Sequence, residues 1–361
     1  MRIVMIAFSN LEYTIELTEG LAGLEDVTLM IPRRELNRFG RVIQPHVKVV
    51  PFYFPRMRYP TNVPMVYEII RKLYAMKPDV IHLQKGTPWF NIFLFLLKKF
   101  CLVTTIHDVI LLDWPSQRIP FFTYLPPIKY SRQLIVHGEK LRDSMVKEFG
   151  RPAKDINVLP RGVNSIYTRY VKADVEEEPH TIMYFGRIWE YKGLKYLIDA
   201  EPLISEKVPD LKIIIAGKGE DFQKYYDMMV HKERFVVYNE FISDSKVNEL
   251  FQRASLIVLP YVDGSQSGIV PQAYAFRKPV VITDVGSLPE NVDQGVTGYV
   301  VPPRDTRSLA DAIIDLLLND AKRKRMGENA LAKVRGELAW DNIARRTIEV
   351  YRKALSVPGI A

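Results

Sequence analysis

The sequence predicts an α/β protein made of two Rossmann-like, parallel-sheet domains that face a central cleft. Two observations predict this fold. Short apolar runs rich in β-branched residues alternate with amphipathic segments along both halves of the chain, a pattern typical of parallel sheets covered by helices. The length of 361 residues is more than one hydrophobic core usually serves, so we expect two domains of ordinary size.

Five strands are expected in each half, at these apolar runs. In the first half they are RIVMIAF, DVTLMI, DVIHLQ, LVTTIHD and QLIVHG, and in the second half TIMYFGR, LKIIIAGKG, FVVYNEF, SLIVLPY and PVVITD. The opening run is too short for the apolar region of a signal peptide, so we interpret it as a buried first strand.

Helices are expected between the strands, for example at 63–79, 244–255 and 308–318, the last with Ser308 as its N-cap. The apolar segment 89–100 is shorter than the roughly 20 residues that span a bilayer. We interpret it as a core helix that ends at two lysines. A helix on a membrane surface is the alternative.

The alternation of strands and helices is interrupted at residues 160–180, where Pro, Gly and a run of Glu occur. We therefore expect an N-terminal domain at 1–165 and a C-terminal domain at 166–339. The remaining segment, 340–361, begins with an amphipathic pattern beyond the second domain's last strand–helix pair, and we expect a closing helix there.

The excess positive charge lies entirely in the first half. Residues 1–165 contain 23 Lys and Arg against 14 Asp and Glu, whereas residues 166–361 contain 27 against 28. This asymmetry suggests an anionic partner for the first domain, with solvated surface charge as the alternative. Nucleic acid is disfavoured, because the basic residues are scattered and no nucleic-acid-binding motif is present.

Cys101 is the only cysteine, which excludes an intramolecular disulfide and fits a reducing compartment. We expect a cytoplasmic protein, with peripheral contact at the inner membrane face as a further option. The basic, aromatic-rich segment PFYFPRMRYP, residues 51–60, would suit a lipid-linked or anionic acceptor, or would simply pack a long loop.

Two cations follow the predicted strand that ends at Gly186. Arg187 and Lys192 lie in the loop or first helical turn after this strand, where a phosphate or diphosphate could bind. An arginine can hold two oxygens at once and a lysine supplies a compact charge. Ordinary surface charge explains this segment alone equally well.

The segment IIIAGKGEDF contains a turn, Gly217-Lys218-Gly219, between a strand and a helix. Gly-x-Gly by itself is weak evidence for a nucleotide site. The third glycine of the dinucleotide fingerprint is missing, which argues against a nicotinamide enzyme.

Residues 264–272, GSQSGIVPQ, form a loop of small residues that runs into a helix. The glycines and serines allow a ligand to approach the backbone closely, and a helix N-terminus attracts anions. Pro271 is tolerated only in a first turn, so the helix begins near Gly268. A purely structural turn would not need four small residues and Gln266 here, so a binding loop is preferred.

His107 and Asp108 follow the strand LVTTIHD and are expected at the cleft. A neutral histidine can donate to a sugar hydroxyl while the aspartate orients it. A structural His–Asp contact is the common alternative, and His137 is a weaker candidate of the same kind.

Taken together, these segments resemble the retaining glycosyltransferases of family 4, which have the GT-B fold. The resemblance rests on FGRIWEYKG, IIIAGKGED, VYNEFISDSKVNELFQRASLIVLPY and GIVPQAYAFRKPVVITDVGSLPENVDQGVTGYVVPPRD. The segment WDNIARRTIEVYRKAL is similar to the family's closing helix, which crosses back onto the N-terminal domain.

The resemblance implies transfer of a hexose from a UDP- or GDP-linked sugar to a sugar, polysaccharide or lipid-linked acceptor, with retained configuration and without a metal or cofactor. Arg187 and Lys192 would hold the donor's diphosphate, and His107 would contact the transferred sugar. Gln272 would lie near the ribose, and the backbone at Phe241–Ile242 would meet the base. The remaining donor-binding candidates are Gly186, Gly217, Lys218, Gln266, Ser267, Gly268 and Ile269.

The sequence departs from the family pattern of two glutamates separated by seven residues, because Gly264 and Gln272 stand at these positions. The amide of Gln272 can still bond ribose hydroxyls, whereas Gly264 has no side chain, and Asp263 could replace it only if the loop shifts. Ser9-Asn10-Leu11 stand where the family has a glycine pair.

The missing carboxylate need not remove catalysis, because in front-face retention the leaving phosphate can accept the acceptor's proton. The protein's task is then to stabilise charge on the diphosphate. Two other functions remain open: a sugar-nucleotide 2-epimerase, which would need acidic and basic groups at the sugar, and a non-catalytic nucleotide-sugar binder.

Overall fold

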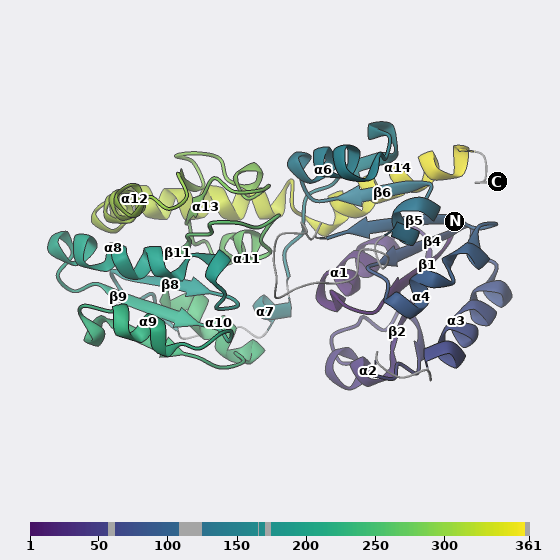
Figure 1. The fold of residues 1–361 in the computed structure, drawn as a ribbon, viewed down its shortest axis with the longest axis horizontal. Helices are drawn as coiled ribbons and strands as arrows, with labels where there is room; N and C mark the ends of the chain where they lie inside the picture. The colour runs from purple at the N-terminus through teal and green to yellow at the C-terminus, as the bar shows by residue number, and fades with distance from the viewer. Residues whose placement is uncertain (57–61, 108–124, 165, 170–174, 358–361) are drawn as a thin grey trace. The chain divides into compact units, whose positions relative to one another are not determined.

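The computed structural model describes residues 1–56, 62–107, 125–164, 166–169 and 175–357. The chain divides into two compact units (Figure 1): unit 1 contains Met1–Pro160 and Trp340–Ala361, and unit 2 contains Arg161–Ala339. Each unit has its own parallel sheet between helices, which confirms the predicted fold class. Within the described residues, no helix is long and apolar enough to cross a membrane.

Unit 1 is built on a seven-stranded parallel sheet in the order β3-β2-β1-β4-β5-β6-β7. Its strands are β1 (Arg2–Ala7), β2 (Asp26–Pro32), β3 (Lys48–Phe52), β4 (Val80–Gln84), β5 (Cys101–Ile106), β6 (Gln133–Val136) and β7 (Ile156–Val158). At the centre, Ile3 of β1 pairs with Val27 on one side and Val80 on the other.

The helices of unit 1 cover both faces of this sheet, as parallel connections require. They are α1 (Leu11–Ala22), α2 (Arg33–Phe39), α3 (Asn62–Met76), α4 (Pro88–Ile92), α5 (Leu125–Tyr130), α6 (Glu139–Phe149) and α14 (Trp340–Ser356), with 3-10 helices η1 (Leu94–Leu97) and η4 (Ala153–Asp155).

The expected single core helix at 89–100 is wrong. The segment forms α4, whose N-cap Thr87 accepts a hydrogen bond from the Phe90 amide at 3.3 Å, and then η1. Phe90, Leu94 and Leu97 are buried, whereas Phe95 and Leu96 are exposed. The segment carries apolar residues around its whole circumference, but only one face of it is buried. At Phe93 the α-helix α4 gives way to the 3-10 helix η1.

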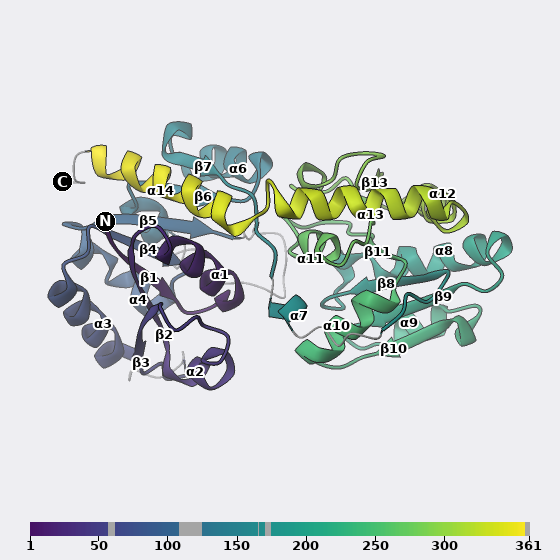
Figure 2. The same ribbon diagram turned by 180° about the vertical axis from the view of Figure 1, so that it is seen from behind.

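The last helix, α14, packs on α1, β5 and β6 of unit 1, which are far from it in sequence (Figure 2). Gly20 permits this contact, because a Cβ there would lie 3.1 Å from the Trp340 carbonyl oxygen and 3.2 Å from the Ala344 Cβ. Arg346 Nη2 donates to the Val158 carbonyl at 3.1 Å, so α14 is also tied to the edge strand β7.

Unit 2 is built on a six-stranded parallel sheet in the order β10-β9-β8-β11-β12-β13. Its strands are β8 (Thr181–Phe185), β9 (Lys212–Ala216), β10 (Phe235–Tyr238), β11 (Leu256–Leu259), β12 (Val280–Thr283) and β13 (Gly298–Val301). Its α-helices are α7 (Ile166–Arg169), α8 (Leu194–Lys207), α9 (Gln223–Met228), α10 (Asp244–Arg253), α11 (Ile269–Ala275), α12 (Thr306–Leu318) and α13 (Asp320–Arg335), and its 3-10 helices η5 (Glu190–Lys192), η6 (Lys232–Arg234) and η7 (Pro289–Asn291).

Ser308 is not the N-cap of the helix expected at 308–318. α12 begins at Thr306, and its cap is Asp305, whose carboxylate accepts from the Ser308 amide at 3.0 Å and from the Ser308 hydroxyl at 2.6 Å. The serine is therefore one partner of the capping carboxylate rather than the cap itself.

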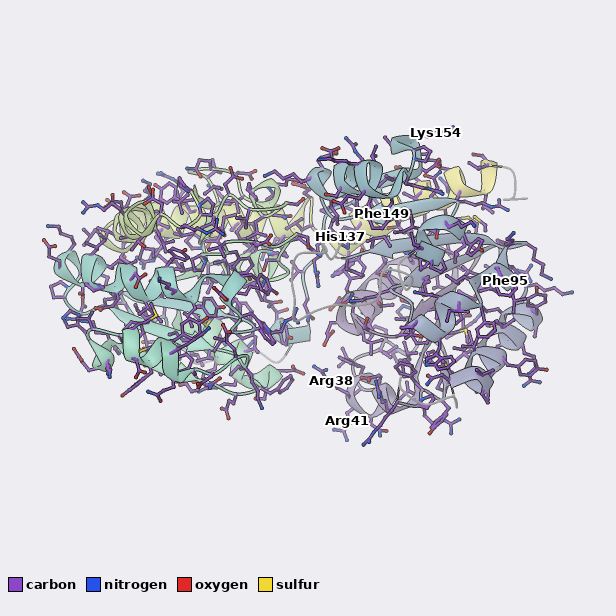
Figure 3. The ribbon with its side chains drawn as sticks, viewed as in Figure 1. Arg38, Arg41, Phe95, His137, Phe149 and Lys154 are labelled. Atoms are coloured by element: carbon purple, nitrogen blue, oxygen red, sulfur yellow. The ribbon has the colours of Figure 1, made fainter. Side chains whose placement is uncertain are left out.

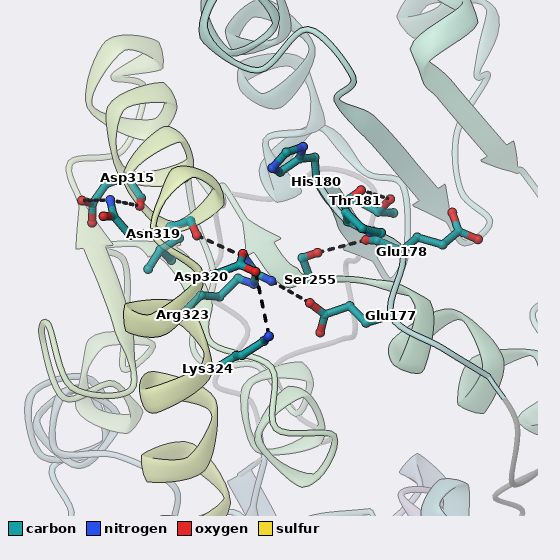
Figure 4. Close-up of polar contacts among 12 residues, drawn as sticks. Glu177, Glu178, His180, Thr181, Ser255, Asp315, Asn319, Asp320, Arg323 and Lys324 are labelled. Atoms are coloured by element: carbon teal, nitrogen blue, oxygen red, sulfur yellow. Dashed lines mark hydrogen bonds and ion pairs between the residues drawn. The ribbon is translucent and has the colours of Figure 1, made fainter.

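Ion pairs fasten the segment before β8 to the rest of unit 2 (Figure 4). The Glu177 carboxylate accepts from Arg323 of α13 at 2.8 Å, as Figure 4 shows. It also accepts from the buried Lys278 at 2.6 Å. Glu178 accepts from Arg253 at 2.7 Å, and this bond holds the pKa of Glu178 below its usual value. The Ser255 hydroxyl donates to the Glu178 carbonyl at 3.0 Å.

Candidate functional site

Tyr261, two residues after the end of β11, lies at the centre of the candidate site of unit 2 and is 1% exposed. Lys192 Nζ lies 3.6 Å from the centroid of its ring, and the Ser267 hydroxyl lies 3.1 Å from its hydroxyl. Burial raises the pKa of Tyr261 to about 12, while the Ser267 bond and the charge of Arg187 act in the opposite direction. One neutral ring thus connects both predicted cations with the loop 264–268.

The backbone that carries Arg187 is held by glycine contacts. A Cβ on Gly217, where φ is 151°, would lie 1.8 Å from the Gly186 carbonyl oxygen, so only glycine fits. The Tyr184 hydroxyl donates to the Arg187 carbonyl at 3.0 Å. Arg187 is an exposed residue, so a fixed backbone carries a cation at the surface.

The turn Gly217-Lys218-Gly219 lies beside this loop. The Ile188 amide donates to the Lys218 carbonyl at 3.2 Å, and Ile188 and Gly219 form an isolated parallel bridge between the two loops. A Cβ on Gly219 would lie 1.8 Å from the Ile188 carbonyl oxygen. The glycines therefore serve close packing of two loops, and Lys218 is exposed at their edge.

Lys192 ends η5 and is followed by Gly193 in the left-handed conformation, with φ 67°. A Cβ on Gly193 would lie 1.8 Å from the Pro260 carbonyl oxygen, and the Val262 amide donates to the Tyr191 carbonyl at 2.9 Å. These contacts press the turn against the end of β11, so a cation reaches the face of Tyr261.

The loop 264–268 is fixed from the opposite side by Gly286, where a Cβ would lie 1.9 Å from the Gly264 carbonyl oxygen. Gln266 and Ser267 are buried. α11 begins at Ile269 with Gly268 as its N-cap, and the predicted start of this helix is confirmed. Asp263 is used locally, because its carboxylate accepts from the Gly264 amide at 2.6 Å.

Gln272, in the middle of α11, is 2% exposed. In the described part of the chain, neither the nitrogen nor the oxygen of its amide has a hydrogen-bond partner. A buried polar group without a partner costs about 1–3 kcal/mol. This arrangement indicates a polar ligand that can both donate and accept.

Phe241 and Ile242 lie between β10 and α10. The Phe241 side chain is 75% exposed and Ile242 is 8% exposed, and Ile242 belongs to the same hydrophobic cluster as Tyr261. The side chain of Ile242 is therefore used for packing, which leaves the backbone of the pair for a ligand.

His107 lies in unit 1, directly after β5, and is 2% exposed. Its Nε2 lies 2.9 Å from Gln84 Oε1, and its ring lies 4.9 Å from that of Tyr13 and 5.0 Å from that of His137. His137 Nδ1 lies 3.0 Å from the Leu159 carbonyl oxygen. Asp108 lies outside the described residues, as do residues 57–60 of the segment 51–60.

The turn after β1 keeps its conformation without glycine. Asn10 adopts φ 55° and ψ 42° ahead of α1, in the left-handed region that asparagine tolerates better than most residues. Asparagine thus replaces glycine here at little conformational cost.

Two residues of these arrangements, Tyr261 and Gln84, were missed in the sequence. Both stand at the carboxyl end of an expected strand, SLIVLPY and DVIHLQ respectively. The same positional rule that selected Arg187 and His107 would have selected them.

Two family profiles match the chain: "Glycosyltransferase Family 4" over residues 12–165 and "Glycosyl transferases group 1" over residues 179–319. An uncharacterized glycosyltransferase of Methanocaldococcus jannaschii, MJ1607, is 28% identical over 324 residues, covering 82% of this chain and 81% of that protein.

Among solved structures, HepE of Anabaena, in complex with UDP, matches with a TM-score of 0.73 and 17% identity, covering 98% of this chain and all (100%) of that one. A UDP-GlcNAc 2-epimerase of Neisseria meningitidis, bound to UDP-GlcNAc, matches with a TM-score of 0.65 and 13% identity, over 98% and 100% of the two chains. Both matches show the shared two-sheet fold. The two family profiles show that the chain belongs to the family 4 glycosyltransferases, a family of retaining hexosyltransferases, and the structural matches show that it has the GT-B fold.

Proposed function

We propose that this glycosyltransferase moves a hexose from a UDP- or GDP-linked sugar to a hydroxyl acceptor, without a metal. Unit 2 would bind the donor and unit 1 would carry the acceptor side. The observation that carries the proposal is that Lys192 lies over the buried ring of Tyr261, near enough to Arg187 for the charge of that guanidinium to lower the pKa of the tyrosine. HepE, which shares the fold, was solved with UDP, and this supports a UDP-linked donor.

In this proposal Arg187 and Lys192 hold the diphosphate and stabilise the charge that develops on it as the sugar leaves. Tyr261 supports Lys192 through the negative face of its ring. With a pKa of about 12, its hydroxyl stays neutral at neutral pH and adds no negative charge beside the diphosphate. The leaving phosphate would accept the acceptor's proton, and His107 would contact the transferred sugar.

The remaining donor contacts follow from the loops around Tyr261. Gln272 would bond the ribose hydroxyls, which satisfy both its donor and its acceptor. The backbone at Phe241–Ile242 would meet the base. The other proposed contacts of the donor are Gly186, Gly217, Lys218, Gln266, Ser267, Gly268 and Ile269.

The epimerase alternative is less well supported, although an epimerase shares the fold. Proton transfer at the sugar would need an available acid and base. The nearest carboxylate of the loop, Asp263, is bound to the Gly264 amide, and the pKa of Tyr261 is too high for a base at neutral pH. A non-catalytic nucleotide-sugar binder is the other alternative, and it predicts binding of the donor without turnover.

The test is turnover by Arg187→Ala and Lys192→Ala with nucleotide-sugar donors, measured as nucleoside diphosphate released only when acceptor is present. Loss of the preorganised cation should lower the rate by about 100-fold or more in each variant. Lys195→Ala, which removes an exposed lysine three residues further on, is the matched control and should keep the wild-type rate. Wild-type rates in Arg187→Ala and Lys192→Ala would contradict the proposal. A changed sugar without transfer would support the epimerase.

We also propose that unit 1 contacts an anionic membrane surface from the side of α3, α4 and η1. The exposed large apolar side chains of these elements are Val63, Tyr67, Tyr74, Ile92, Phe95 and Leu96. The elements are neighbours, since the Tyr74 hydroxyl donates to the Leu96 carbonyl at 2.9 Å. Figure 3 marks Phe95 at the surface of unit 1. An exposed patch of this kind marks an interaction site.

The charge around this patch favours anionic lipid. Lys98 and Lys99 are exposed, and Lys99 Nζ lies 3.7 Å from the ring centroid of Tyr74. The acidic residues of 62–107 are Glu68 and Asp79, and Glu68 pairs with Lys72 at 2.6 Å. Aromatic rings with a basic rim suit the interface of an anionic membrane.

Sedimentation with phosphatidylcholine vesicles, with and without phosphatidylglycerol, tests this contact. Binding should require phosphatidylglycerol and should weaken in Lys98→Ala/Lys99→Ala and in Phe95→Ser/Leu96→Ser. Lys140→Ala/Lys147→Ala on α6 removes two exposed lysines elsewhere on unit 1 and should bind as the wild type does. Equal loss in this control would show non-specific charge attraction only and would overturn the proposed surface.

A further inference from the structure

A chain of buried polar side chains connects His107 to the last helix. Gln84 of β4 lies between His107 and a pair formed by His82 and Thr105, and His82 in turn contacts Tyr351 of α14. His82, Gln84, Thr105 and Tyr351 are each 0% exposed. This series of hydrogen-bonded side chains thus joins β4 and β5 to α14, whose Tyr351 is 269 residues from His82 in sequence.

The hydrogen-bond distances indicate which ring nitrogen of His107 and of His82 carries the proton. Gln84 Oε1 lies 2.9 Å from His107 Nε2, and a carbonyl oxygen only accepts, so His107 carries its proton on Nε2. Gln84 Nε2 lies 3.1 Å from His82 Nε2 and 3.3 Å from the Thr105 hydroxyl oxygen. Because an amide NH₂ only donates, His82 Nε2 must be the unprotonated nitrogen.

The far end of the chain completes this assignment. Burial lowers the pKa of His82 to about 3, so this ring is neutral and its single proton is on Nδ1. It is donated to the Tyr351 hydroxyl at 2.6 Å. The Tyr351 hydroxyl can in turn donate a hydrogen bond to Met5 Sδ at 3.6 Å. Every donor between Met5 and His107 then has an acceptor.

The opposite arrangement is also self-consistent inside the chain. If the Gln84 amide were turned over, its NH₂ would face His107, and His82 would need its proton on Nε2 to meet the oxygen. His107 would then carry its proton on Nδ1. The Tyr351 hydroxyl separates the two arrangements through Met5, because its hydrogen is directed to Met5 Sδ and its oxygen is then left to accept the Nδ1 proton of His82. In the opposite arrangement the hydroxyl would instead donate to His82 Nδ1, and Met5 would lose its donor.

We propose that Gln84 is a positioning residue that sets the imidazole tautomer of His107, and that Tyr351 holds Gln84 in this orientation through His82. Since Nε2 of His107 is engaged by Gln84, a substrate contact of this imidazole would use Nδ1. An unprotonated Nδ1 accepts a hydrogen bond from a sugar hydroxyl and does not donate one. Tyr351 of α14 would therefore determine whether His107 is the donor or the acceptor in this contact.

This inference rests on the proposed role of His107 for its effect on catalysis, but the tautomer itself is measurable without substrate. Nitrogen-15 NMR of the histidine side chains distinguishes Nε2–H from Nδ1–H rings. In the wild type, His107 should be the Nε2–H tautomer.

Tyr351→Phe removes one hydroxyl far from His107. His82 then moves its proton to Nε2, which faces the NH₂ of Gln84, and the donor–donor conflict turns the amide over. The prediction is that His107 shifts to Nδ1–H. Adding Gln84→Glu should restore Nε2–H, because a carboxylate only accepts on both sides.

Thr104→Val is the matched control, because it removes a neighbouring buried hydroxyl of β5 that bonds Ser131 at 2.7 Å instead of this chain. It should leave the tautomer and the activity unchanged. An Nε2–H ring in Tyr351→Phe, or an equal shift in Thr104→Val, would overturn the inference.

The activity of the same variants separates this inference from the proposed function. Tyr351→Phe should lower kcat about tenfold, the value of one well-placed hydrogen bond, with little change in KM for the donor, and Gln84→Glu should rescue it in the double variant. A shifted tautomer with wild-type kcat would uphold the positioning chain and contradict the role of His107. An unshifted tautomer would refute the positioning chain whatever the rate.

Discussion

Two buried glutamines show how differently the two units are built. Gln84 in unit 1 is 0% exposed and its amide meets His82, Thr105 and His107. Gln272 in unit 2 is 2% exposed, and within the described residues neither atom of its amide has a hydrogen-bond partner. The first is satisfied by the fold, whereas the second is a cost that a ligand could remove.

The same contrast extends to how each unit positions its candidate residues. Unit 1 holds His107 by buried side chains, and unit 2 holds Arg187 and Lys192 by backbone contacts that only glycine permits. Side-chain positioning can be tuned by single polar atoms, whereas backbone positioning fails when a Cβ is added.

Gly217→Ala should have the largest effect on stability, because φ is 151° and the new Cβ would lie 1.8 Å from the Gly186 carbonyl oxygen. We expect a loss of about 3 kcal/mol, from overpacking and backbone strain together. Equilibrium urea unfolding measures it. Gly295→Ala, at φ 72° with nothing within 4 Å, should lose about 1 kcal/mol. Equal losses would mean that close packing is not what unit 2 depends on.

Gln84→Leu should destabilise the chain by about 2 kcal/mol, because it leaves partners of the amide buried without a hydrogen bond. Urea unfolding again measures the change. If Gln84→Leu were neutral or stabilising, the hydrogen bonds of the Gln84 amide would not stabilise unit 1, and Gln84 would not differ from Gln272 in this respect.

Gln272→Leu should act in the opposite direction and stabilise the ligand-free chain by about 1 kcal/mol, because it removes an unpaired buried amide. The same variant should bind nucleoside diphosphates about tenfold more weakly, through the loss of ribose contacts. Thermal unfolding with and without UDP or GDP shows both effects. Destabilisation without ligand would mean that the amide has a structural partner.

Glu178→Gln should have the smallest effect, below about 1 kcal/mol, because its ion pair with Arg253 is partly exposed. The pKa of Glu178 is lowered in the folded chain, so the pair stabilises above the carboxyl's ordinary pKa. This stability is lost as the pH falls through the lowered pKa. The wild type and the variant should therefore differ in melting temperature at pH 7 and converge in acid.

The central strands and the edge strand β10 could be predicted from the sequence, whereas the other three edge strands of the two described sheets could not. The ten expected runs correspond to strands of the two sheets, whereas β3, β7 and β13 were missed. Each of these lies at a sheet edge, where one side has no strand neighbour. KVVPF contains a proline and INV has three residues, so neither carries the long apolar run of a buried strand.

The candidate site was predictable where a charged residue follows a strand, as at Arg187 and Lys192. It was not predictable where the decisive feature is a contact. Nothing in the sequence shows that Lys192 meets the ring of Tyr261 or that Gln84 meets His107, because both contacts join separate elements. The break of 89–100 at Phe93 likewise depends on how much surface the sheet can cover.

The most direct test of the central claim is titration calorimetry of each nucleotide pair, UDP with UMP and GDP with GMP, on the wild type, Arg187→Ala, Lys192→Ala and the control Lys195→Ala. We predict that the second phosphate strengthens binding of one pair at least tenfold in the wild type and the control, and that each site variant loses this gain. A gain that survives in both site variants would contradict the account.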